Sequence, residues 1–198
     1  MLTLQKINSN DNTLDIVSIY PDYLFAVKFD DKDHNEYEAA FSLWRDLDYL
    51  VDFFDENKHL LENEFWHNAV SSTDSEDLAQ SVVNESFDFE KYIKEIAANT
   101  ANGEMPDFDE FFKELGGQYK FLREHVPHKS YGTASPTMLR LYAIRISANC
   151  YVVVHGGIKL TKQIQDTPQL KKELFPKIDN VLRFFKANGI IDSEDLKD

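Results

Sequence analysis

Basic, phenolic and imidazole side chains gather in the C-terminal third of the chain. Six of them could do chemistry together: Arg140, Tyr142, Arg145, His155, Lys159 and Lys162. Cutting RNA at a 2′-hydroxyl needs such groups, because one must take the 2′ proton, one must stabilise the charge on phosphorus, and one must protonate the leaving oxygen. The alternative interpretation is that the cations face solvent and Tyr142 is half-buried.

Two predicted strands and a helix must position these residues. The segment 139–146 alternates in polarity and 150–160 is rich in β-branched residues, so the two predict a hairpin. Alternation places Arg140 and Tyr142 on one face and Arg145 on the other. Thr167-Pro168 then begins a helix with apolar residues at spacings of three and four, and Asn188-Gly189 ends it.

This region resembles the C-terminal part of the RelE/HigB-type toxin superfamily, in particular its phage-derived branch. The matching residues are Arg140, Tyr142, His155, Gly156, Lys159, Thr161, Thr167 and Pro168. Leu160 stands where that family commonly has a second lysine. Residues 138–187 are also similar to a bacterial family of uncharacterised function with an LRLYAIRI…GGIKLTK core behind an acidic helical region.

The resemblance implies a RelE-like α+β core, an mRNA interferase-type ribonuclease acting at the ribosome, and an antitoxin protein as partner. It assigns catalysis to Arg140, Tyr142, His155 and Lys159. RNA or phosphate binding then falls to Arg145, Thr161 and Lys162.

The rest of the chain predicts further strands and several helices. We expect strands at 14–20 and 23–29, a third at Tyr37–Phe41, helices at 42–61, 76–98 and 107–115, and a polar linker at 123–137. The predicted fold class is α+β, an antiparallel sheet with helices packed on it. Residues 1–122 form an acidic N-terminal region and 138–198 a RelE-like hairpin and helix, within what we expect to be one compact domain.

Charge is divided unevenly along the 198 residues, whose net charge is −14. Residues 1–116 hold 8 basic and 27 acidic residues, whereas 117–198 hold 13 basic and 8 acidic ones. The excess of acid disfavours non-specific nucleic-acid binding by the whole molecule, while the C-terminal part can still present a basic face.

Other classes of site find little support. His125 and His128 flank a proline in the predicted linker, and the calcium-like series Asp31, Asp33, Asn35 lacks the glycine and the final glutamate that such a loop needs. We therefore expect no metal and no cofactor. Cys150 is the single cysteine, and no apolar run reaches the ~18 residues of a membrane span, so we expect a cytoplasmic protein that does not cross a membrane.

Three functions stay open: a toxin-like ribonuclease or a degenerate relative of one, a non-catalytic acidic interaction protein on a RelE-like scaffold, and a metabolic enzyme for a small anionic ligand. In the second, the acidic helices either cover the basic hairpin or present a nucleic-acid-like surface to a partner. An acidic side chain from residues 74–114 filling the basic cleft would favour it. No motif supports the third, and the sequence does not fix the oligomeric state.

Overall fold

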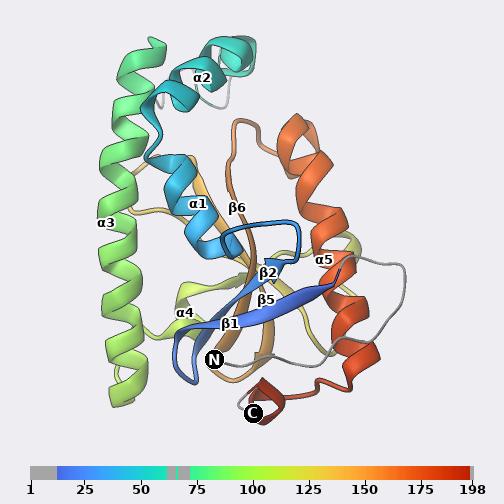
Figure 1. The fold of residues 1–198 in the computed structure, drawn as a ribbon. Helices are drawn as coiled ribbons and strands as arrows, with labels where there is room; N and C mark the ends of the chain where they lie inside the picture. The colour runs from blue at the N-terminus through green and yellow to red at the C-terminus, as the bar shows by residue number, and fades with distance from the viewer. Residues whose placement is uncertain (1–12, 62–65, 67–71, 197–198) are drawn as a thin grey trace.

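The computed structural model describes residues 13–61, 66 and 72–196. Its centre is a six-stranded sheet in the order β1-β2-β6-β5-β4-β3 (Figure 1). The strands are β1 Leu14–Tyr20, β2 Leu24–Phe29, β3 Lys113–Glu114, β4 Pro127–Lys129, β5 Leu139–Ser147 and β6 Cys150–Ile158. All neighbouring pairs are antiparallel except β2 and β6, so the fold is α+β.

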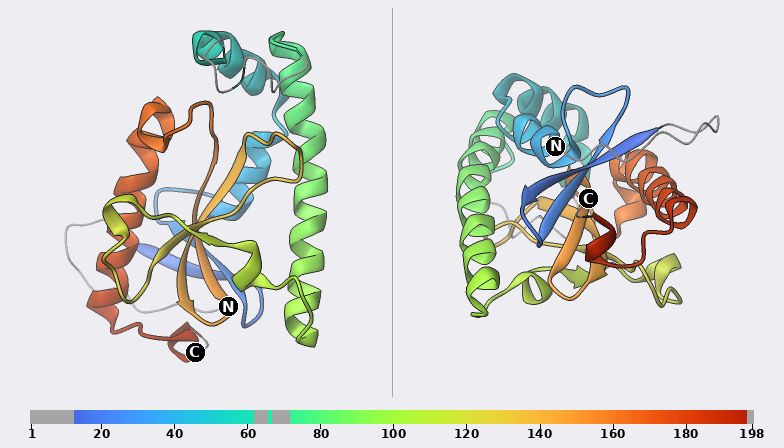
Figure 2. Two further views of the ribbon diagram at one scale, coloured as in Figure 1. Left: turned by 180° about the vertical axis from the view of Figure 1, so that it is seen from behind. Right: turned by 60° about the horizontal axis from the view of Figure 1, so that its bottom comes forward.

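Helices cover both faces of the sheet. They are α1 Glu36–Trp44, α2 Leu47–Leu61, α3 Ser75–Asn102, α4 Phe108–Phe111 and α5 Pro168–Asn188, with short 3₁₀ turns at Gly117–Tyr119, Ile164–Asp166 and Ser193–Leu196. Figure 2 shows α1 and α3 on one side of the sheet and α5 on the other. Strands from both halves of the chain lie in this one sheet.

The alternation of β5 divides its side chains between two hydrophobic cores, as predicted. Leu139, Leu141 and Ala143 pack in the core shared with α1, α2 and α3. Tyr142 and Ile144 pack in the core shared with α5. A bulge in β6 then aligns His155 with Tyr142 across the pair, which places His155 on the α5 face.

Two glycines on β6 let helices approach the sheet closely. A Cβ on Gly156 would lie 2.2 Å from Ala40 Cβ on α1, and one on Gly157 would lie 2.4 Å from Leu170 Cδ2 on α5. Such distances leave no room for a side chain. The His-Gly-Gly segment therefore has a packing role on both faces of the sheet.

The predicted third strand at Tyr37–Phe41 is wrong, because this segment lies in α1. The side chain of Asn35 accepts hydrogen bonds from the amides of Tyr37 and Glu38, and Glu38 reaches back to the Asn35 amide. This capping box begins a helix at Glu36, six residues before the expected start at residue 42. Tyr37, Phe41 and Trp44 then fall on one buried helical face.

Three other boundaries differ from the predictions. The helix expected over 42–61 is interrupted after Trp44, and the helix after Asp107 ends at Phe111. The expected linker at 123–137 contains β4, which extends the sheet beyond β5. Its Pro127 is at the first position of the strand, where a missing amide donor is tolerated. Across the described residues, no helix combines the length and apolarity that a membrane span requires.

Candidate functional site

Arg140 is a buried cation with an unsatisfied donor. Its side chain is packed into the start of β5, and its Nη1 donates to the backbone oxygens of Thr137 at 3.0 Å and Leu139 at 2.6 Å. The guanidinium carbon lies 4.3 Å from the centre of the Tyr131 ring. Its Nε has no hydrogen-bond partner, and no described carboxylate forms an ion pair with it.

Tyr142 carries a second unsatisfied donor on the same face of β5. It is completely buried, its ring stacks on His155 with centroids 6.5 Å apart, and its hydroxyl has no partner. Burial raises the pKa of this phenol, so the hydroxyl keeps its proton. A buried donor without an acceptor costs about 1–3 kcal/mol, so two beside each other mark a place where an acceptor is missing.

Two lysines lie beside these donors. Lys129 on β4 is aligned with Tyr142 and sits 5.9 Å above the Tyr131 ring. Lys159 follows β6, and its ammonium donates to the Lys162 backbone oxygen at 2.9 Å. Burial, together with the charges of Arg140 and Lys129, lowers the pKa of Lys159 to about 8. We call Lys129, Tyr131, Arg140, Tyr142 and Lys159 the cationic cluster.

Glu85 of α3 is the carboxylate whose charge acts on Arg140, and it is already hydrogen-bonded to other groups. It accepts hydrogen bonds from Thr137 Oγ1 at 2.5 Å and from the Ala134 amide at 3.1 Å. Burial outweighs these bonds and raises its pKa. Among the described residues, three cations, Lys129, Arg140 and Lys159, thus lie together near this carboxylate and beside the two buried unsatisfied donors. Such an arrangement can bind an anionic oxygen of a phosphate or carboxylate.

His155 belongs to a different group, the buried ion cluster of Glu36, His155 and Lys177. Lys177 on α5 donates to Glu36 Oε2 on α1 at 2.7 Å, and its Nζ lies 3.1 Å from His155 Nδ1. Glu36 Oε2 also lies 3.4 Å from that nitrogen. The register of β2 with β6 ends at Val153, so His155 lies just beyond the point where the two parallel strands part.

The electrostatics of this cluster favour an ionised carboxylate. Burial is the largest effect on Glu36 and acts to raise its pKa, but the hydrogen bond with His155 and the charge of Lys177 together bring the pKa below its ordinary value. Sequence reasoning missed both Glu36 and Lys177. Glu36 resembles any acidic residue in a first helical turn, and Lys177 is one of several lysines on α5, so neither carries a distinguishing sequence signal.

Arg145 lies on the opposite face of β5 from Arg140 and already forms an ion pair with Asp109. Asp109 of α4 accepts hydrogen bonds from its Nε at 3.0 Å and its Nη2 at 2.9 Å, and also from the Tyr151 hydroxyl at 2.8 Å. Burial acts to raise the pKa of Asp109, but these bonds outweigh it and lower the pKa. The structure thus does not bring Arg145 to the other predicted phosphate-binding residues.

Thr161 and Lys162 lie in the loop between β6 and α5. The Thr161 hydroxyl is buried, donates to the Gln163 backbone oxygen at 2.5 Å, and lies 2.8 Å from the Thr167 hydroxyl. These bonds hold the loop that carries Lys159. Lys162 is exposed and contributes its backbone oxygen to Lys159. Leu160, where the resembling family has a lysine, is buried, and its backbone oxygen accepts from Trp66 Nε1 at 2.7 Å.

Sequence reasoning also missed Lys129 and Tyr131, because the segment was expected to be a linker. Their two-residue spacing becomes informative only once the segment is known to be extended, since positions i and i+2 of a strand share a face. After β4 the backbone continues alongside β5, since the Ser130 amide donates to the Leu141 oxygen at 2.8 Å and the Gly132 amide donates to the Leu139 oxygen at 3.1 Å. This path brings Tyr131 over Arg140.

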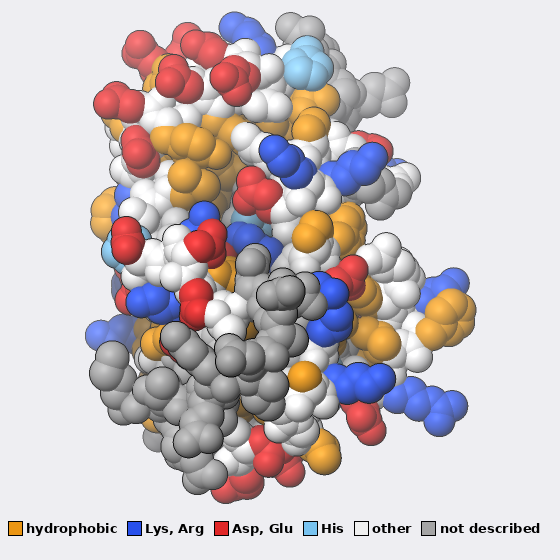
Figure 3. Space-filling view, turned by 45° about the vertical axis from the view of Figure 1, so that its right-hand side comes forward, with side chains coloured by type: hydrophobic (Ala, Val, Ile, Leu, Met, Phe, Trp, Pro, Cys, Tyr) orange, Lys and Arg blue, Asp and Glu red, His pale blue; other side chains and the backbone are white. Residues whose placement is uncertain are grey.

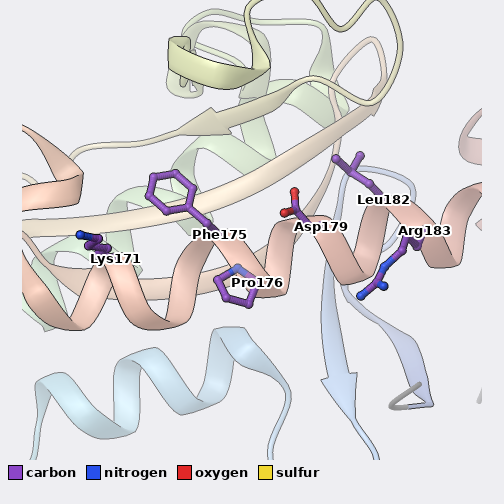
Figure 4. Close-up of a pocket in the computed structure, with 6 residues that line it drawn as sticks. All are labelled: Lys171, Phe175, Pro176, Asp179, Leu182 and Arg183. Atoms are coloured by element: carbon purple, nitrogen blue, oxygen red, sulfur yellow. The ribbon is translucent and has the colours of Figure 1, made fainter. Parts of the chain in front are cut away.

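Figure 3 shows acidic side chains gathered at the end of the molecule where Figure 1 places α2 and again at the opposite end, with several lysine and arginine side chains on the face between them. A hollow of about 820 Å³ on the outside of α5 is lined by Lys171, Phe175, Pro176, Asp179, Leu182 and Arg183 (Figure 4). The Asp179 carboxylate in this hollow already accepts a hydrogen bond from the Tyr119 hydroxyl at 3.0 Å. We therefore do not take this hollow as the candidate site.

Comparisons of the chain with protein-family models, with curated proteins and with solved structures each gave no match. The toxin resemblance therefore stays a prediction. In the described ranges, no three His, Cys, Asp or Glu side chains converge so as to hold a metal ion.

Proposed function

We propose that the protein is a toxin-like RNA-binding protein that holds a phosphodiester group at the cationic cluster. The observation that carries this proposal is the pair of buried, unpartnered donors, Arg140 Nε and Tyr142 hydroxyl, beside Lys129 and Lys159. A phosphate at the cluster would bring acceptor oxygens towards these donors, both of which lie below the surface, and would offset the mutual repulsion of the cations. The local positive charge makes this binding compatible with a net charge of −14.

Cleavage would require more than binding. Lys159, with a pKa of about 8, suits the role of accepting the 2′-hydroxyl proton, after which the 2′ oxygen attacks phosphorus and the 5′ oxygen leaves. The leaving oxygen then needs an acid. Tyr142 is a poor acid, because burial raises its pKa. His155 is turned to another group, since its ring lies against Glu36 and Lys177. The geometry therefore supports RNA binding more strongly than interferase activity, which stays a prediction.

The test measures binding of a fluorescein-labelled single-stranded RNA by anisotropy at low and at physiological salt. Arg140→Met is expected to weaken binding at least tenfold, and Lys129→Met severalfold, because each removes a phosphate contact. Lys94→Met is the matched control, since it makes the same charge change on the exposed side of α3. Because Arg140 is buried, thermal melts must first show that each variant is folded.

Equal binding by the wild type and folded Arg140→Met and Lys129→Met variants would overturn the proposal. The same RNA, analysed for a 2′,3′-cyclic phosphate end, tests cleavage. If the interferase prediction is right, that product appears with the wild type and is lost in Lys159→Met.

A non-catalytic interaction protein is the second candidate, and one observation favours it. Asp109, from the acidic part of the chain, accepts two hydrogen bonds from Arg145 on the hairpin. A hollow of about 700 Å³ between α2 and α3 also carries carboxylates from Asp48, Asp52, Glu76 and Asp77, a negative surface for a partner. Capture of a basic protein partner that is lost in Asp52→Asn/Glu76→Gln, together with absence of RNA binding, would favour this function over the first.

A further inference from the structure

Tyr131 is an exposed aromatic ring held rigidly at the edge of the cationic cluster. It is 45% exposed, although its neighbours Ser130 and Gly132 are bonded to β5 through their backbones. The Ser130 amide donates to Leu141 oxygen at 2.8 Å, and the Gly132 amide donates to Leu139 oxygen at 3.1 Å. The exposure of the ring is therefore a fixed feature of the fold.

The segment next to the ring is constrained from the other side as well. A Cβ on Gly132 would lie 2.0 Å from Glu85 Oε1, so the chain passes tightly against α3 at this point. The Arg140 guanidinium carbon lies 4.3 Å from the centre of the Tyr131 ring. The buried guanidinium occupies the part of the ring that it contacts, so a base would stack on the exposed part of the ring, next to the phosphate site.

We propose that Tyr131 is a stacking platform for an unpaired nucleobase, so that the ligand of the cationic cluster is single-stranded RNA. This inference rests on the proposed phosphodiester site. A base of a duplex is stacked between its neighbours and cannot lie on the ring, whereas a single strand can place its phosphate at Arg140 and its base on Tyr131. Stacking adds affinity without reading the identity of the base.

The experiment compares three labelled ligands: a single-stranded RNA, a duplex of the same length, and a ribose-phosphate oligomer without bases. The wild type is expected to bind the single strand at least about fivefold more tightly than the base-free oligomer, as stacking of one base on an aromatic ring provides. Tyr131→Phe keeps the ring and should keep this preference. Tyr131→Leu should lose it while still binding the base-free oligomer.

The outcomes separate the two proposals. Equal affinity of the wild type for the base-bearing and base-free strands, with loss of both in Arg140→Met, would overturn the stacking platform and leave the phosphodiester site in place. A preference that survives in Tyr131→Leu would overturn it too. Absence of binding to every ligand would overturn the proposed function itself.

Discussion

Lys177 on α5 donates a 2.7 Å hydrogen bond to Glu36 on α1, and the two residues are 141 positions apart in the sequence. The bond joins helices that cover opposite faces of the sheet, next to His155 and beyond the end of the β2–β6 pairing. Glu36 is nearly inaccessible and Lys177 is about one-fifth exposed. An ion pair at this place holds the two helical layers together at the point where the sheet divides.

We expect Lys177→Met to lower the free energy of unfolding by about 3–5 kcal/mol, because it leaves the buried Glu36 carboxylate beside a neutral side chain. Urea unfolding followed by circular dichroism measures this change. The exposed pair of Asp31 and Lys32 supplies the control, so Lys32→Met should cost less than about 0.5 kcal/mol. Restoring part of the loss with Glu36→Gln in the Lys177→Met background would support the same account. Equal effects of the two lysine substitutions would contradict it.

The lowered pKa of the Glu36 carboxylate leads us to expect a loss of folding stability in acid. The pKa of Glu36 is lower in the folded protein than its ordinary value of 4.5, so between the two values the unfolded chain binds more protons. Its contribution is therefore complete above pH 4.5 and is lost as pH falls through the lower, folded-state value. Urea midpoints of the wild type and Glu36→Gln between about pH 3 and pH 7 should converge at the acid end. A constant difference over this range would refute the prediction.

The close contact between Gly156 and α1 leads to a prediction about stability that depends on packing alone. Gly156→Ala places a methyl group 2.2 Å from Ala40 Cβ, which is fixed to the α1 backbone, so we expect a loss of about 1–3 kcal/mol or more. Gly157→Ala is the comparison, because its clash is with the flexible end of Leu170 and should cost less. Ala40→Gly should rescue Gly156→Ala by removing the opposing methyl group. Thermal unfolding of the wild type and these three variants decides the order.

The lowered pKa of Lys159 leads to a prediction about how RNA affinity depends on pH. With a pKa of about 8, its ammonium loses its charge as pH rises past this value, so the affinity for single-stranded RNA should fall over that range. Lys159→Arg stays charged and should bind with a flatter profile. Lys94→Arg, on the exposed side of α3, should follow the wild type. Identical profiles for the wild type and Lys159→Arg would show that Lys159 does not contact the phosphate.

Local rules predicted the parts of the fold that depend on neighbours in sequence. Alternating polarity defined β5 and assigned Arg140 and Tyr142 to one face and Arg145 to the other, as the two cores and the Asp109 pair confirm. Pro168 and Gly189 marked the ends of α5 for the same reason, since a missing amide and a left-handed backbone are requirements of single positions.

Tertiary structure alone decided which of the chemically capable residues meet. The sequence placed His155 with Lys159, whereas packing of α1 and α5 against β6 brought it to Glu36 and Lys177. Tyr131 reached Arg140 because β4 joined the sheet, and a three-residue strand with a proline leaves little signal of its own. Contacts between distant segments arise from the docking of whole elements, and no local pattern of residue types encodes which faces will dock.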